Sequence, residues 1–125
     1  MTSPLRSVAA VRIFVSDLER ARAFYRDAVG LSETGSGPAY VVFALGTTTI
    51  VLEAVPLHEP EHDELVGRLL GVSFDVADVE QAQRELAARG VGFLGPPEKQ
   101  DWGGTLAFAC DPDGNIITLV QLPAG

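Results

Sequence analysis

Apolar and polar residues alternate near the start of the chain and again about sixty residues later. The two stretches are 11–15 (VRIFV) and 72–76 (VSFDV). Alternation with a period of two is typical of a strand that has one face against a core. After each stretch, apolar residues recur every three or four positions, which is the spacing of a helix with one buried face. The pattern therefore predicts two copies of a strand followed by a helix.

The residues that flank the two helical segments support this interpretation. Asp17 and Asp78 stand where a helix N-cap is expected, since an aspartate there can accept a hydrogen bond from a free backbone N–H. Gly30 and Gly90 stand where each helix is expected to end, because glycine readily adopts the left-handed conformation of a helix stop. The offset between the copies is 61 at the aspartates and 60 at the glycines, so the chain contains an internal repeat.

Three further strand-like runs follow each helix. They are 31–34, 39–45 and 47–55 in the first half, and 91–95, 104–109 and 115–122 in the second. The sequence Asp111-Pro-Asp-Gly-Asn115 is a strong turn signal between the last two runs. Each half is thus predicted to be β-α-β-β-β, and the fold class is α+β.

With 125 residues, the chain is long enough for one compact domain and too short for two ordinary ones. We expect a single domain over 1–125, with module one at about 8–55, a connector at 56–69 and module two at about 70–122. The connector is acidic and is predicted to be helical over 61–69. Because one helix on a short sheet makes a thin core, the two modules are expected to pair around a shared cavity.

Charge and cysteine content narrow the possible partners. Nine Lys and Arg against seventeen Asp and Glu give a net charge of −8, which disfavours binding to nucleic acids and to anionic membrane surfaces. The single Cys110 excludes an intramolecular disulfide and a cysteine-rich zinc site. No apolar run reaches the roughly 18 residues that would span a bilayer. We therefore expect a cytoplasmic protein with no nucleic-acid or membrane partner.

Several segments, in this order, resemble the vicinal oxygen chelate superfamily. They are DLERARAFY with the following Gly-Leu, VADVEQA, Arg89-Gly-Val, Trp102-Gly-Gly and, above all, DPDGNIITLV from Asp111 onward. This superfamily includes glyoxalase I, extradiol dioxygenases, fosfomycin-resistance enzymes and bleomycin-resistance proteins. The resemblance spans about Val8 to Gln121. It implies two βαβββ modules that form a U-shaped mixed sheet around a cavity, with the helices on the outer face.

The metal-using members of this superfamily hold a divalent ion, and the resemblance implies where its ligands would stand in this chain. Three of those positions fall on Ala10, Gly71 and Thr118, and only Glu53 is a plausible ligand. A protein-bound divalent ion needs about three suitable ligands. We therefore expect no metal and no other cofactor. The alternative is a divalent metal held by an unusual set that includes Glu53.

The string His58-Glu-Pro-Glu-His62 matches the zinc-protease pattern H-E-x-x-H. That site needs both histidines on one face of a continuous helix, and Pro60 disfavours such a helix. We interpret the string as a solvated acidic loop and assign no metal ligand to it.

Strand alternation also predicts which side chains face the cavity. If residues 11, 13 and 15 face the helix, their neighbours face the other way, and the same rule applies to the other strands. Trp102 is added because its glycine-rich loop borders the ligand site in the proteins that the chain resembles. The predicted ligand-binding residues are Arg12, Phe14, Glu53, Ser73, Asp75, Trp102 and Thr118.

Purely structural roles are open for the same residues. Arg12 and Asp75 can form an ion pair with each other or with a partner chain. Glu53 is a candidate acid or base if it is unpaired and part of the scaffold if it is paired. Trp102 can serve local packing or a dimer contact instead of a ligand.

The leading hypothesis for function is a metal-free small-molecule-binding protein of the bleomycin-resistance, antibiotic-sequestering type. Its ligand would be small and partly aromatic, and the acidic chain favours a cation. A homodimer is implied by the resemblance. The alternative is a glyoxalase- or dioxygenase-like enzyme (a lyase, isomerase, oxygenase or transferase) with Glu53 as acid or base and Arg12 as oxyanion partner. A third option is a role in protein–protein contact.

Overall fold

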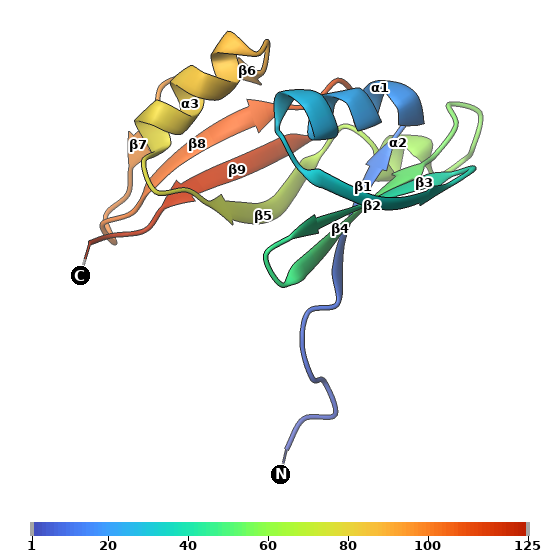
Figure 1. The fold of residues 1–125 in the computed structure, drawn as a ribbon, viewed down its shortest axis with the longest axis horizontal. Coiled ribbons are helices and arrows are strands. Elements are labelled where there is room, and N and C mark those ends of the chain that lie inside the picture. The colour runs from blue at the N-terminus through green and yellow to red at the C-terminus, as the bar shows by residue number, and fades with distance from the viewer. Residues whose placement is uncertain (1, 125) are drawn as a thin grey trace.

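The computed structural model describes residues 2–124 and contains the predicted element order twice (Figure 1). Module one consists of β1 (Ala10–Val15), α1 (Leu18–Ala23), its π-helical continuation η1 (Phe24–Ala28), β2 (Ser32–Gly37), β3 (Tyr40–Leu45) and β4 (Thr48–Ala54). The connector contains α2 (His62–Leu65). Module two consists of β5 (Leu69–Asp75), α3 (Val79–Ala88), β6 (Gly92–Phe93), β7 (Glu98–Lys99), β8 (Thr105–Cys110) and β9 (Ile116–Gln121).

The two modules form two mixed sheets with equivalent topology. The order is β1-β4-β3-β2 in the first and β5-β9-β8-β6 in the second, where β7 also pairs with β8. In each sheet the first strand is parallel to its neighbour and the remaining pairs are antiparallel. α1 and α3 lie on the same side of the two sheets (Figure 1). The predicted α+β class with two βαβββ modules is confirmed. None of the helices within residues 2–124 has the length and apolar character needed to cross a membrane.

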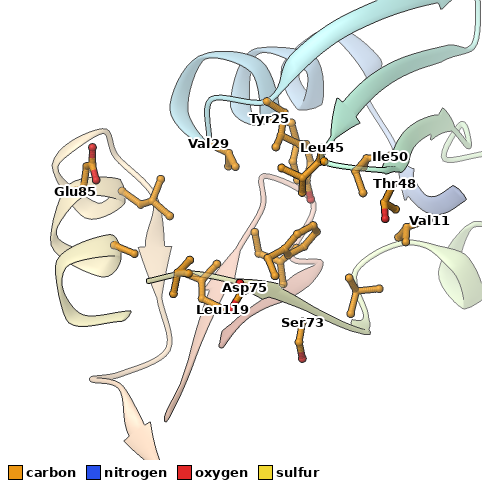
Figure 2. A pocket seen from close by; sticks show the side chains of 18 of the residues that line it. Val11, Tyr25, Val29, Leu45, Thr48, Ile50, Ser73, Asp75, Glu85 and Leu119 are labelled. Carbon is orange, nitrogen blue, oxygen red and sulfur yellow. The ribbon is translucent and has the colours of Figure 1, made fainter. Parts of the chain in front are cut away.

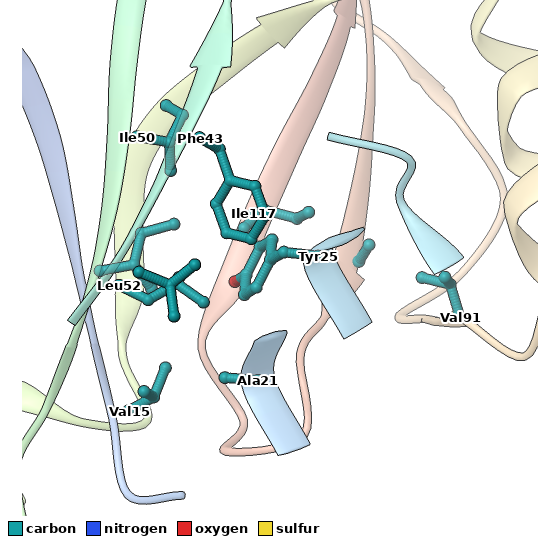
Figure 3. Packing of buried hydrophobic residues seen from close by; sticks show 11 residues of the cluster. Val15, Ala21, Tyr25, Phe43, Ile50, Leu52, Val91 and Ile117 are labelled. Carbon is teal, nitrogen blue, oxygen red and sulfur yellow. The ribbon is translucent and has the colours of Figure 1, made fainter. Parts of the chain in front are cut away.

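Alternation along β1 places its side chains as predicted. Ile13 and Val15 are fully buried, whereas Arg12 is exposed. The buried pair packs with Tyr25 and with residues of β3 and β4, and this cluster also takes in Ile117 from β9 (Figure 3). One hydrophobic core therefore joins the two modules, which explains why neither small sheet has to be stable alone.

The predicted helix caps and stops are confirmed. Asp17 accepts a hydrogen bond from the Arg20 N–H at 3.1 Å, and Asp78 accepts one from the Gln81 N–H at 3.0 Å. Gly30 has φ 91° and is typical of a left-handed helix stop.

The first helix differs from the prediction in its last turn, where the hydrogen bonds of η1 have the wider π-helical spacing. Apolar periodicity does not distinguish a π turn from an α turn over so few residues.

Two boundaries differ from the predicted ones for identifiable reasons. The connector helix ends at Leu65 because Leu69 already pairs with Ile116 in the second sheet. The strand predicted over 91–95 is reduced to Gly92–Phe93, and β7 follows as a separate short strand. Between them, Pro96 and Pro97 have no N–H to give to a sheet ladder, so the strand is interrupted.

A buried hydrogen-bond cluster at the Asp111–Asn115 turn connects the modules. The Asp111 carboxylate accepts from the Tyr25 hydroxyl at 2.8 Å and from the Asn115 amide at 2.9 Å. The Asn115 amide also donates to the carbonyl of Phe14 at 2.9 Å, and its oxygen accepts from the Gly67 N–H at 2.8 Å. The turn thereby contacts α1–η1, β1 and the connector at once. Burial and the neighbouring Asp111 carboxylate raise the pKa of Tyr25.

Replacing Tyr25 by Phe is expected to destabilise the protein by about 1–3 kcal/mol at neutral pH, because buried Asp111 loses a donor. The raised pKa keeps Tyr25 protonated in the folded state, whereas tyrosine in the unfolded chain ionises at about pH 10. The free energy of unfolding of the wild type is therefore expected to fall as the pH rises above the pKa of the unfolded tyrosine. The Tyr25→Phe variant is expected to lack this contribution to the pH dependence. Urea unfolding of both proteins at about pH 7 and about pH 11 checks this, with Tyr40 retained in both. An equal pH slope in the two proteins would contradict it.

Candidate functional site

A cavity of about 740 Å³ lies between the two modules on the helix side of both sheets (Figure 2). Module one contributes β1, η1 and β4 to its wall, and module two contributes β5, α3 and β9. Most of the wall is apolar; its members include Val11, Val29, Ile50, Phe74, Leu86 and Leu119. The volume is in the range of about 300–1,000 Å³ that small-molecule sites occupy.

The cavity follows from the alternation of the strands on either side of it. Val72 and Phe74 of β5, and Val76 just after it, face the same side as Ala82 and Leu86 of α3. α3 rests on its own sheet and α1–η1 rests on the other, so an apolar gap remains between the helices. Because the walls come from both modules, the relative position of the modules sets the size of the space.

Polar groups are confined to a few positions of the cavity wall. Arg89, just after α3, donates to the Ala28 carbonyl at 3.1 Å and to the Glu85 carboxylate at 3.0 Å. Arg89 therefore bridges η1 and α3, and its charge is balanced by Glu85. Asp75, on the edge strand β5, is exposed and makes no ion pair among the residues that the structure describes. Its side chain lies on the face of β5 opposite Phe74, so Asp75 borders the cavity at its edge and its carboxylate does not point into the space.

The structure brings only part of the predicted binding set to this cavity. Ser73 and Asp75 border it because they lie on the edge strand β5. Trp102 lies in the loop before β8 and is 56% exposed. The remaining four predicted residues do not line the cavity, because they lie on the sheet faces that point away from the helices. They are Arg12, Phe14, Glu53 and Thr118.

Arg12 and Glu53 form a two-pronged ion pair on the open face of the first sheet. Nη2 of Arg12 donates to Oε1 at 3.1 Å, and Nε donates to Oε2. The guanidinium carbon lies 5.2 Å from the centre of the Phe14 ring, within the range of a cation–π contact. The hydrogen bonds that Arg12 donates to Glu53, together with the negative charge of that carboxylate, raise the pKa of Arg12. Arg12 thus pairs with Glu53 and not with Asp75.

Strand register tests whether the chain fits the metal ion of the proteins it resembles. The repeat equates Arg12 with Ser73, and these residues are opposite Val51 and Thr118 respectively. In module one, the position equivalent to Thr118 of β9 is therefore Val51 of β4, and Glu53 lies two residues further along β4. Within residues 2–124, no three His, Cys, Asp or Glu side chains converge. The donor set does not fit that ion.

Sequence reasoning missed the residues that line the cavity from the helices, namely Val29, Ala82, Leu86 and Arg89. The helical spacing of Ala82 and Leu86 predicts a buried face, which is ordinarily part of a core, whereas Val29 and Arg89 lie outside that pattern. Periodicity reports the direction in which a side chain points but not whether the space before it is filled. No signal in one sequence separates these two cases.

Comparison with known proteins gives the same family over most of the chain. The model of the glyoxalase/bleomycin resistance protein/dioxygenase superfamily matches residues 7–119. A member of that superfamily from Sphaerobacter thermophilus is 29% identical, with a TM-score of 0.79 over 94% of this chain and 98% of that one. TnmS3, an antibiotic binding protein from Streptomyces sp. CB03234, is 30% identical, with a TM-score of 0.77 over 98% of this chain and 100% of that one.

An enzyme of the same fold is also similar in structure. A lactoylglutathione lyase from Agrobacterium tumefaciens has a TM-score of 0.75 over 94% of this chain and 95% of that one. At 21% identity this likeness concerns the fold alone. The repeated modules, the shared core and the family match together lead to one conclusion: the chain belongs to the glyoxalase/bleomycin resistance protein/dioxygenase superfamily.

Proposed function

We propose that the protein binds a small, largely apolar molecule without a metal ion and without changing it chemically. The observation that supports this most directly is the cavity of about 740 Å³ between the modules. An apolar enclosure with a few polar groups is suited to a ligand held by burial and oriented by one or two contacts. Phe74 in its wall adds aromatic surface, which favours a partly aromatic ligand.

The ligand proposed is an antibiotic or a molecule of similar size, which the protein sequesters. TnmS3, which is 30% identical over nearly the whole chain, is described as an antibiotic binding protein. The net charge of −8 favours a ligand with a cationic group. A cytoplasmic location belongs to the same proposal, since the single Cys110 suits a reducing compartment.

We also propose that two copies of the chain form a homodimer. β1 and β5 are each paired on one side only, so both sheets end in an open edge. The segment 2–9 extends away from the body (Figure 1), and its Leu5 is 84% exposed. A second copy would cover these surfaces. The sheet faces with Arg12, Phe14, Glu53 and Thr118, together with the loop that carries Trp102, would then line an enclosed space, where these residues are proposed as ligand contacts.

The enzyme alternative finds less support in the geometry. Both carboxylate oxygens of Glu53 accept hydrogen bonds from Arg12. A paired Glu53 has a structural role, and this pairing disfavours Glu53 as a catalytic acid or base. Binding is therefore the function that we propose.

Ligand binding at the cavity is tested with the neutral apolar fluorophore N-phenyl-1-naphthylamine. Wild-type protein is expected to enhance its fluorescence in a saturable way. Ala82→Phe places a ring into the cavity and is expected to weaken binding at least about tenfold, or roughly 1.4 kcal/mol. Ala88→Phe, at an exposed position of the same helix, is the matched control and is expected to bind as wild type. Equal affinity in wild type and Ala82→Phe, with both proteins folded by circular dichroism, would refute a site at this cavity.

Metal independence is tested by calorimetric titration of chelator-treated protein with Mn²⁺, Ni²⁺, Zn²⁺ and Fe²⁺. We expect no stoichiometric binding, because the converging donors that such an ion needs are missing from the described chain. His58→Gln controls for weak association with the exposed connector histidine. Stoichiometric binding that Glu53→Ala abolishes would overturn the metal-free proposal.

The dimer is tested by sedimentation equilibrium. The expected mass is twice the 13.2 kDa of the chain. Leu5→Asp is expected to shift the protein toward the single chain, because a charge on the apolar segment disfavours burial against a second copy. Ser3→Asp adds the same charge on the same segment and serves as the control. A single-chain mass for the wild type at high concentration would rule the dimer out.

A further inference from the structure

Outside the cavity, three side chains form a hydrogen-bonded series where the connector meets module one. The Ser16 hydroxyl oxygen lies 2.7 Å from Nε2 of His62, and Nδ1 of His62 lies 2.9 Å from a carboxylate oxygen of Asp63. Ser16 follows β1, whereas His62 and Asp63 belong to α2, which lies beside the end of β1 (Figure 1). The two partners of the first bond are 46 residues apart in the sequence.

The order of these contacts defines the roles of the two ring nitrogens. A carboxylate accepts hydrogen bonds, so Nδ1 carries the proton and donates to Asp63. Nε2 of the neutral ring then presents a lone pair, and the Ser16 hydroxyl donates to it. Serine, histidine and aspartate in this order and at these distances are the arrangement by which hydrolases activate a serine, and it is recognised by geometry rather than by position in the sequence.

The backbone around Ser16 suits a nucleophile. Ser16 lies in the sharp turn between β1 and α1, the kind of strand-to-helix junction that presents a reactive serine in other folds. Its own N–H donates to Asp113 at 3.1 Å, and Asp113 is in turn paired with Arg20 at 2.9 Å. The N–H groups of Asp17 and Leu18 donate to no atom of residues 2–124. Such groups, next after the serine, can stabilise an oxyanion.

Exposure of the three side chains is consistent with the same roles. Ser16 is half-buried, so it is not sealed inside the core. The His62 side chain is only 12% exposed, which limits its rotation away from the serine. The Asp63 side chain is fully exposed, so its hydrogen bond competes with water and can orient the ring only weakly.

We propose that Ser16 is a nucleophile toward small activated acyl esters, with His62 as its general base and Asp63 as a positioning residue. The Ser16 oxygen forms a bond to the ester carbonyl carbon while its proton passes to Nε2 of His62. The bond from that carbon to the leaving oxygen breaks, and His62 returns the proton to the leaving group. Water then attacks the acyl-serine with the same base, releasing the acid and restoring the hydroxyl. This activity is separate from the binding proposed for the cavity.

The test is covalent labelling by an alkyl fluorophosphonate, located by peptide mass spectrometry. We expect one adduct, on Ser16, and none in Ser16→Ala. His62→Gln is expected to slow labelling about 100-fold, the contribution typical of a general base. Asp63→Asn, at a fully exposed position where folding is not at risk, is expected to slow it by a few-fold only. Hydrolysis of p-nitrophenyl acetate should fall in the same order.

Matched controls separate this activity from background reactivity. His58→Gln removes the other histidine of the chain, and Ser36→Ala removes an exposed serine on β2; both are expected to label as wild type. A wild-type protein without an adduct on Ser16 would overturn the proposal. A labelling rate unchanged in both His62→Gln and Asp63→Asn would also do so, and would leave the three side chains a structural role in fixing the connector. Binding of the naphthylamine probe is measured independently and does not depend on either result.

Discussion

At the Asp111–Asn115 turn, two buried polar side chains form hydrogen bonds with three separate parts of the chain. Within a few ångströms, Asp111 and Asn115 hold the π-helical continuation of the first helix, the end of β1 and the start of the chain segment that leads into β5. Each of these contacts satisfies a buried polar group that would otherwise be costly. The turn thus fixes two small modules into one body.

The cavity is a direct consequence of that constraint. Tyr25 belongs both to the turn cluster and to the cavity wall, so the hydroxyl that is held by Asp111 also places an aromatic ring beside the cavity. On the other side, Arg89 ties α3 to the end of η1. These two contacts connect the modules on either side of the cavity. The same geometry that supplies a shared core therefore leaves a space for a ligand.

This chain has the fold of the family, but three of the positions where metal-using members are expected to have ligands hold Ala10, Gly71 and Thr118. Alanine and glycine offer no donor, and the register shows that Glu53 is displaced by two residues from the position equivalent to Thr118. Glu53 pairs instead with Arg12 on an open sheet face, with Phe14 beneath the guanidinium. Among the described residues, no three suitable donors converge, which supports the metal-free binding that we propose.

Local periodicity and the conformations that Asp, Gly and Pro allow specify the two βαβββ modules, their caps and stops, and the side of each strand that faces a helix. The same local signals indicate the Asp111–Asn115 turn and separate buried Ile13 from exposed Arg12. The place of the cavity among the helix-facing residues, the pairing of Arg12 with Glu53 and the contact of Ser16 with His62 are visible only in the folded chain. Those outcomes depend on the distance and register between segments far apart in the chain, and no local pattern encodes either quantity.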